Sequence, residues 1–191
     1  MWPWEHLAVG YVLVSLLWRL RGERPDLLAA FAVAFGTQFP DLVDKPLAWV
    51  FGVFDSGIAA GHSVLVAVPL CTVLVALAYR AGYVRAAAAF SVGYFSHIPG
   101  DAFYPMFYGQ PFRWKVFFWP ISQGAGEGQV DFLAQVLRFL SRTESFATSP
   151  QGATYIGFEL LLLLTAFSLW ALDGAPGLPR PWETGSKAGE R

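Results

Sequence analysis

The chain has 191 residues, of which 55% are hydrophobic and 17% aromatic, while only 14% are charged. Soluble domains average about 25% charged residues, so one soluble core of this length could not bury so much apolar surface. The net charge is −1 and the sequence has no basic tract, which argues against a nucleic-acid partner. The composition therefore predicts an all-α, polytopic membrane bundle.

Apolar segments along the chain predict about four to five transmembrane helices. In chain order they cover residues 6–20, 25–39, 63–79, 83–97 and 153–172. About twenty apolar residues cross a typical hydrocarbon core, so the first two segments are short for a span. We expect Pro40 to end the second helix. The apolar stretch 46–54 is too brief to cross, and either lies in the interface or re-enters the membrane.

Residues 102–151 predict an interfacial segment instead of a span. Within it, YPMFYGQPFRWKVFFWPI is aromatic, rich in proline and carries Arg113 and Lys115, a composition typical of the membrane interface. Residues 129–142 repeat apolar side chains at helical spacing and predict an amphipathic helix on the bilayer surface. We therefore expect one integral-membrane domain over residues 1–172, followed by a disordered tail over residues 173–191.

The basic residues predict how the bundle is oriented in the cell membrane. Positive charge in short connections marks the cytoplasmic side. With five spans and an external N-terminus, the residues predicted on that side are Arg19, Arg21, Arg24, Arg80, Arg85, Arg180, Lys187 and Arg191.

The histidines of the chain all fall at the non-cytoplasmic ends of predicted helices. His6 opens the first helix, His62 precedes the third, and His97 closes the fourth. Carboxylates accompany them: two follow the second helix in FPDLVDKP, and one follows His97 by a single helical turn. The side chains predicted to meet at one membrane level are His6, Asp41, Asp44, His62, His97 and Asp101.

This mixture of imidazole nitrogens and carboxylate oxygens favours a divalent metal ion. Zinc is the first choice, with manganese or iron as alternatives. Such an ion offsets the desolvation of carboxylates near lipid, and it lowers the pKa of a bound water to about 7. A carboxylate not needed as a ligand would act as the general base, which makes Asp41, Asp44 and Asp101 the catalytic candidates.

Each of these residues also has a simpler structural interpretation. A single histidine at a helix end is more often an interfacial hydrogen-bonding group, and Asp41, Asp44 and Asp101 could each cap a turn or a helix. Ser63, beside His62, is either a nucleophile or, as we favour, the N-cap of the third helix. Their joint placement favours a site, because no histidine is left elsewhere in the chain.

Five motifs follow one another along the chain in this order: EHLAVG, FPDLVDKP, GHSVL, GYFSHIPGD and PFRWKVFFWPI. This order resembles the LexA-binding, inner-membrane-associated metal-dependent hydrolases, the YdjM family. The resemblance covers residues 5–121. It implies a small integral-membrane hydrolase whose metal ligands are the three histidines and three aspartates named above.

Two features depart from the family pattern. An arginine usually precedes the histidine–serine pair, and SGIAAGHS lacks it. If that arginine binds an anionic substrate group, Arg113 or Lys115 is our candidate to replace it. The second departure is Pro99, which we expect to end or kink the fourth helix and so to disturb the shared face of His97 and Asp101.

The leading hypothesis is a membrane-embedded, metal-dependent hydrolase that acts on a lipid or another amphiphilic ester or phosphoester through a metal-activated water. The alternative is a non-enzymatic metal-binding or transport protein that uses the same cluster. Transport would need a polar path across the bilayer, and only Glu159 comes near to supplying one. A third hypothesis is an assembly protein whose cluster fixes helix packing. The sequence predicts neither the substrate nor the oligomeric state.

Overall fold

The computed structural model describes residues 1–122 and 132–178, which form helices and loops with no β-strand among them. The predicted all-α architecture is therefore confirmed. In chain order the elements are α1 (Pro3–Arg19), α2 (Leu27–Trp49), the short 3-10 helix η1 (Ala60–His62), α3 (Val64–Ala81), α4 (Val84–Phe103), two further 3-10 helices, η2 (Tyr104–Tyr108) and η3 (Trp114–Phe118), α5 (Phe132–Ala147) and α6 (Pro150–Leu172).

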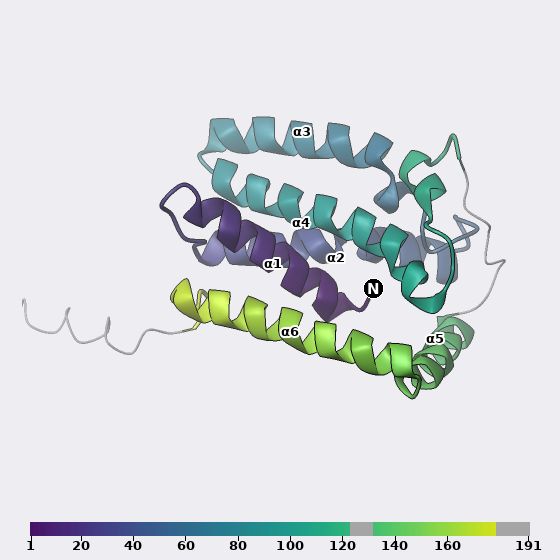
Figure 1. Ribbon diagram of the computed structural model, residues 1–191. Coiled ribbons are helices and arrows are strands. Elements are labelled where there is room, and N and C mark those ends of the chain that lie inside the picture. The colour runs from purple at the N-terminus through teal and green to yellow at the C-terminus, as the bar shows by residue number, and fades with distance from the viewer. Residues whose placement is uncertain (123–131, 179–191) are drawn as a thin grey trace, which may run out of the picture.

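The long helices α1, α2, α3, α4 and α6 run along one another, and their connections gather at two opposite ends (Figure 1). The α1–α2 and α3–α4 connections and the C-terminal end of α6 lie at one end, which we call the arginine end after Arg19, Arg80 and Arg85. The N-terminus, the α2–α3 connection, η2, η3 and α5 lie at the other (Figure 1). We call it the histidine end.

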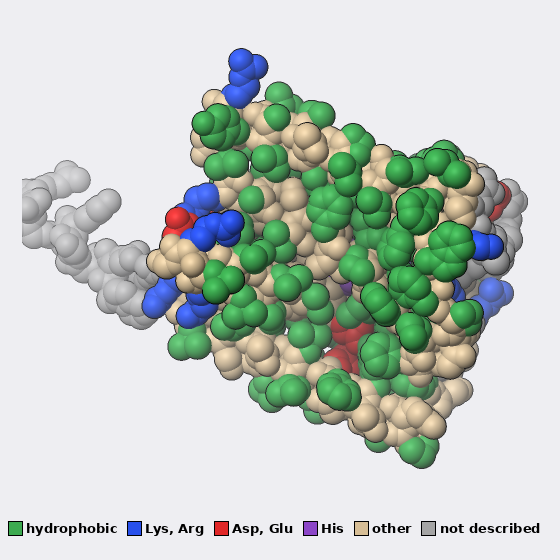
Figure 2. All heavy atoms as spheres, turned by 45° about the horizontal axis from the view of Figure 1, so that its top comes forward, with side chains coloured by type: hydrophobic (Ala, Val, Ile, Leu, Met, Phe, Trp, Pro, Cys, Tyr) green, Lys and Arg blue, Asp and Glu red, His purple; other side chains and the backbone are tan. Residues whose placement is uncertain are grey.

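Among the described residues, three helices, α2, α3 and α6, are long and apolar enough to cross a membrane. Large side chains on them remain exposed, including Leu77 (62%), Phe158 (66%) and Leu164 (63%). Figure 2 shows hydrophobic side chains over most of the face drawn, with Lys and Arg towards its two ends. Lipid tails can solvate such a surface, so the membrane bundle is confirmed. The total of four to five spans stays a prediction.

Helix α2 continues through Pro40 and Pro46 to Trp49, so the prediction that Pro40 ends the second helix is wrong. An internal proline removes a hydrogen bond and costs about 3 kcal/mol in an isolated helix. Here Pro40 is fully buried, and the next turn is fixed by Asp44, which accepts backbone hydrogen bonds from the following loop. Tertiary contacts thus carry the helix past the proline and keep Asp41 and Asp44 on it.

Helix α4 likewise runs through Pro99 to Phe103, so the expected disruption between His97 and Asp101 is also wrong. The proline removes only one hydrogen bond near the end of the helix. Its neighbour Ile98 is only 1% exposed and packs in the core, which holds this last part of the helix in place. His97 and Asp101 therefore share one face, with Nε2 and Oδ2 3.6 Å apart.

Glycines allow α2 and α4 to pack backbone against backbone. A Cβ atom at Gly36 would lie 2.2 Å from the backbone oxygen of Phe90, and one at Gly93 would lie 2.6 Å from that of Val33. Small residues favour such close helix contacts in a membrane, where lipid tails provide no hydrophobic driving force. The contact lies about one turn before His97, so it sets the spacing between the polar residues that follow on the two helices.

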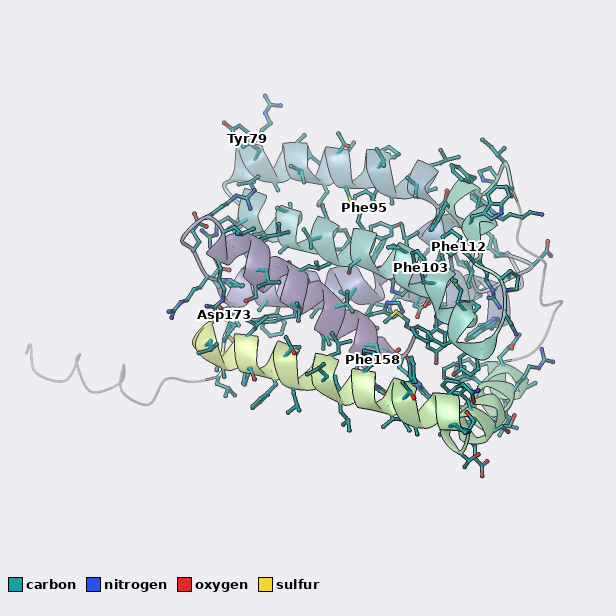
Figure 3. All side chains as sticks on the ribbon, in the orientation of Figure 1. Tyr79, Phe95, Phe103, Phe112, Phe158 and Asp173 are labelled. Atoms are coloured by element: carbon teal, nitrogen blue, oxygen red, sulfur yellow. The ribbon has the colours of Figure 1, made fainter. Side chains whose placement is uncertain are left out.

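At the arginine end, the buried carboxylate of Asp173 joins the end of α6 to α1. It accepts hydrogen bonds from Tyr11 (3.1 Å), Ser15 (2.7 Å) and Arg19 (2.6 Å). Figure 3 labels Asp173 at this end, opposite Phe103 and Phe112. The predicted boundary of the tail is corrected accordingly, because residues 173–178 form turns against the bundle. Residues 179–191 of that tail lie outside the described residues.

Two further polar contacts join α6 to α1 nearer the histidine end. The indole Nε1 of Trp4 donates to Oε1 of Glu159 at 2.5 Å, and the hydroxyl of Tyr155 donates to Glu5. Glu5 is only 2% exposed, and its other oxygen accepts from the backbone N–H of Trp2. Glu159 therefore bonds a neighbouring helix.

The amphipathic helix predicted over residues 129–142 is observed as α5, and its first predicted residues, 129–131, lie outside the described part of the chain. Helix α5 lies across the histidine end of the bundle (Figure 1). Ring contacts hold it there, with centroids 4.4 Å apart for Trp2 and Phe139 and 4.3 Å apart for Tyr108 and Phe146. Its position in the membrane interface stays a prediction.

The contact between α2 and α4 predicts a large effect of a single methyl group. We expect Gly36→Ala to lower the free energy of unfolding by about 1–3 kcal/mol, because the new Cβ would overlap the backbone of α4. Gly157→Ala on α6 is the matched control, since nothing lies within 4 Å of its Cβ position. Thermal unfolding in detergent measures both variants, and equal melting temperatures would contradict the predicted close packing.

Candidate metal centre

Asp44 fixes the loop that carries His62. Its carboxylate accepts hydrogen bonds from the backbone N–H groups of Ala59 (2.6 Å), Gly61 (2.8 Å) and His62 (3.2 Å), and it pairs with Nδ1 of His62 at 2.8 Å. A Cβ at Gly61 would lie 2.8 Å from the backbone oxygen of Pro40, so this close approach requires glycine. Both oxygens of Asp44 are thus occupied. Asp44 orients His62 and does not itself face a shared ligand position.

His62 and His97 point their Nε2 atoms at each other, 3.0 Å apart. Nδ1 of His62 is held by Asp44, and Nδ1 of His97 lies 2.6 Å from the backbone oxygen of Thr37. Because both of these partners are acceptors, each Nδ1 is placed to donate a proton, which leaves an Nε2 lone pair on each ring whenever that ring is neutral. Two facing lone pairs repel unless they share a proton or a metal ion. Hydrogen bonds of this kind to Nδ1 are how proteins orient metal-binding imidazoles.

Asp41 and Asp101 bring carboxylate oxygens to the same place. Oδ1 of Asp41 lies 3.6 Å from Nε2 of His62 and 3.8 Å from Nε2 of His97. Oδ2 of Asp101 lies 3.4 Å and 3.6 Å from the same two nitrogens. His6 completes the group, because its Nε2 is 3.0 Å from Oδ1 of Asp101 and its ring stacks on that of His97 at 3.7 Å. We call these five residues the His/Asp cluster.

The cluster fits a divalent metal ion. Ligand atoms about 2.0–2.2 Å from a tetrahedral zinc ion lie about 3.3–3.6 Å from one another. Donor atoms of His6, Asp41, His97 and Asp101 all lie within 4.8 Å of one another. Oδ1 of Asp41 is buried and has no hydrogen-bond partner among the described residues, whereas buried acceptors are nearly always satisfied. A cation held by the cluster, or the water that this cation binds, would satisfy this oxygen.

The electrostatics at His62 also favour a cation. Burial alone lowers the pKa of its imidazole, but the carboxylates of Asp101 and Asp44 outweigh that effect and raise the pKa to about 9. The carboxylates therefore draw a proton onto the ring when no other positive charge is present. A metal ion would take the place of this proton, because metal-bound imidazole is neutral.

Five of the six predicted metal ligands thus meet in the His/Asp cluster. Asp44 is not a member, because its carboxylate bonds the loop backbone and Nδ1 of His62. The sequence analysis overlooked Lys45, whose Nζ pairs with Oδ2 of Asp41. Its position four residues after Asp41 on one helix was the available signal. It also overlooked the backbone oxygen of Thr37, which orients His97. No sequence pattern marks that contact, because any residue supplies a backbone oxygen.

The two predicted substrate-binding cations have different surroundings. Arg113 lines a cavity of about 580 Å³ that also borders Asp101 and Lys45. Lys115 is exposed and is not among the residues that line it. The cavity wall includes a second guanidinium, that of Arg138 on α5, which the sequence analysis did not select. On the face drawn in Figure 2, a few acidic side chains and a small area of histidine are visible among hydrophobic side chains.

Ser63 is the N-cap of α3, as favoured from the sequence. Its Oγ accepts a hydrogen bond from the backbone N–H of Leu65 at 3.2 Å. The hydroxyl in turn donates to the backbone oxygen of Trp119 at 2.7 Å. These contacts occupy the hydroxyl group, so the structure favours a capping role over a nucleophilic one.

Comparison with known proteins supports the sequence resemblance. The profile of a family described as YdjM inner membrane protein matches residues 1–175, which include all five long helices and every member of the His/Asp cluster. Neither the curated proteins nor the solved structures that were searched gave a match.

The contact between Asp44 and Nδ1 of His62 predicts that a change at Asp44 weakens metal binding without abolishing it. We expect Asp44→Asn to weaken metal affinity about 10- to 100-fold, because an amide cannot accept all the hydrogen bonds that orient His62. Competition with a chelator measures this affinity on detergent-purified protein. Asp55→Asn, at an exposed position in the same loop, is the control and should bind as wild type. Equal affinities for both variants would contradict the orienting role.

Proposed function

Because the chain belongs to the YdjM family of inner membrane proteins, we propose that it is a membrane-embedded, metal-dependent hydrolase of amphiphilic esters or phosphoesters. The observation that carries this proposal is the convergence of the Nε2 atoms of His62 and His97 with the unpartnered Oδ1 of Asp41. These donors lie at the end of a membrane bundle and beside a cavity, where the headgroup of an amphiphile would be exposed.

The donors divide naturally into ion-binding groups and a base. The Nε2 atoms of His62 and His97 and Oδ2 of Asp101, which lie 3.0–3.6 Å from one another, would hold the ion, with zinc preferred over manganese or iron, and His6 bonds the other oxygen of Asp101. When bound, such an ion supplies a water with a pKa near ~7 and polarises the oxygen of the ester. Asp41 is the remaining carboxylate, and its free Oδ1 would accept a proton from water.

The chemical change is an ordinary hydrolysis. The oxygen of a water molecule forms a bond to the acyl carbon or to phosphorus, and the bond from that atom to the ester oxygen breaks. The proton taken up by Asp41 passes to the leaving oxygen, so the products are an alcohol and an acid. Lys45 holds Oδ2 of Asp41 and thereby directs Oδ1 towards the imidazoles.

The distribution of arginines supports a site on the non-cytoplasmic side. Arg19, Arg80 and Arg85 lie at the arginine end, on or beside the short connections that carry the positive-inside signal. The His/Asp cluster lies at the opposite end. The substrate would then be an amphiphile in the outer leaflet, and membrane lipid would be the immediate partner of the protein.

Metal dependence of hydrolysis tests the proposed activity. Purified protein should contain a divalent metal and should cleave members of a panel of acyl esters and phosphoesters presented in micelles. We expect His97→Ala to lose both the metal and turnover, and chelation of wild type to stop turnover until metal is restored. Asp55→Asn serves as the control for both measurements. A His97→Ala protein with full metal content would overturn the assignment.

The same panel separates hydrolysis from the alternative function. Metal binding with no turnover of any ester, together with metal flux in proteoliposomes, would favour a metal-handling protein.

Labelling of single cysteines tests the orientation. In a Cys71→Ser background, we expect Asp55→Cys at the histidine end to react with a membrane-impermeant maleimide added to intact cells. Glu23→Cys, at the arginine end, should react only after the membrane is opened. The reverse pattern would place the site on the cytoplasmic side and would leave its metal chemistry unaffected.

A further inference from the structure

The cavity beside the His/Asp cluster is built from elements that are distant in sequence. Its volume is about 580 Å³, and Asp101 connects it to the cluster. Helix α2, η2 and α5 all contribute to its walls, and α5 lies across the histidine end (Figure 1). Apolar and aromatic side chains make up much of the lining: Trp49, Ile58, Val136, Phe139 and Leu140. Such a lining suits the part of an amphiphile next to its headgroup.

Positive charge in this cavity exceeds what the neighbouring carboxylates neutralise. Lys45 is paired with Asp41. The guanidinium of Arg113, by contrast, has one polar contact among the described residues, at 3.5 Å to the uncharged amide oxygen of Gln110. Arg138 lines the cavity and forms no ion pair with any carboxylate in the described part of the chain. Within the described residues, the two guanidinium groups that line the cavity therefore have no carboxylate partner.

Guanidinium groups select phosphate because their paired N–H donors match phosphate oxygens and keep their charge at any physiological pH. A phosphate monoester carries close to two negative charges, which balances two arginines. A zwitterionic diester headgroup brings no net charge and would leave both arginines uncompensated. An uncharged headgroup would also leave both arginines uncompensated. The chemistry of the cavity thus discriminates between substrates that share identical apolar tails.

We propose that Arg113 and Arg138 bind the terminal phosphate of a phosphate-monoester lipid, so that its ester linkage lies beside the His/Asp cluster. The substrate class rests on the proposed hydrolytic function, whereas binding of the headgroup does not. In this arrangement α5 contributes to substrate selection, because it supplies Arg138 together with part of the apolar lining. Lys115 takes no part, since it lies outside the cavity.

Lipid binding to detergent-purified protein tests the proposal, with native mass spectrometry as the measurement. The probes are phosphatidic acid, phosphatidylcholine and diacylglycerol with the same acyl chains, and inorganic phosphate as a competitor. We expect phosphatidic acid to bind at least about tenfold more tightly than the other two lipids. Arg113→Gln and Arg138→Gln should each weaken its binding about tenfold or more, and leave diacylglycerol unchanged. Lys115→Gln is the matched control.

Each other outcome overturns a defined part of the inference. Wild-type affinity in both arginine variants would remove the phosphate site, and an equal loss in Lys115→Gln would indicate general surface attraction. Displacement of the lipid by inorganic phosphate at similar concentration would identify free phosphate as the ligand. Turnover separates the two proposals. Selective binding without turnover in the metal-loaded wild type rejects only hydrolysis, while turnover that is insensitive to both arginine variants rejects only this inference.

Discussion

The close packing of α2 against α4 is the constraint on which the rest of the structure depends. Gly36 and Gly93 let the two backbones meet, and the polar residues follow within the next turns. One helix supplies Asp41 and the oxygen that orients His97, while the other supplies His97 itself. Separation of the helices by the width of one side chain would move these donors apart by more than a metal–ligand bond length.

The cluster is also a solution to an electrostatic difficulty. Carboxylates at the end of a membrane bundle are costly to bury unless positive charge accompanies them. Asp44 is satisfied by backbone N–H groups, and one oxygen of Asp41 by Lys45. Oδ1 of Asp41 and the facing Nε2 atoms of His62 and His97 remain, and an added cation with its bound water would satisfy them together.

Sequence reasoning predicted that the three histidines lie close together because helix ends alternate between two membrane faces, so the order of the helices alone brings them to one level. It wrongly predicted that Pro40 and Pro99 would interrupt their helices. Helix propensity describes an isolated helix, whereas packing in the bundle decides whether these two helices continue. It could not distinguish Asp44 from the members of the His/Asp cluster, because hydrogen bonds to loop backbone leave no pattern in the sequence. It named Lys115, which lies outside the cavity, and not Arg138, which lines it, because the placement of α5 over the cavity depends on ring contacts between distant segments.

The contacts of α6 have a mechanical consequence for the cavity. Glu159 and Asp173 attach this helix to α1 at points fourteen residues apart, or about 21 Å along the axis. A rod attached at two such points can neither slide nor rotate. Helix α5 precedes α6 almost directly, with Gly152 packed against the backbone of Phe146. The position of Arg138 relative to the His/Asp cluster therefore depends partly on the ion pair between Arg19 and Asp173 at the arginine end.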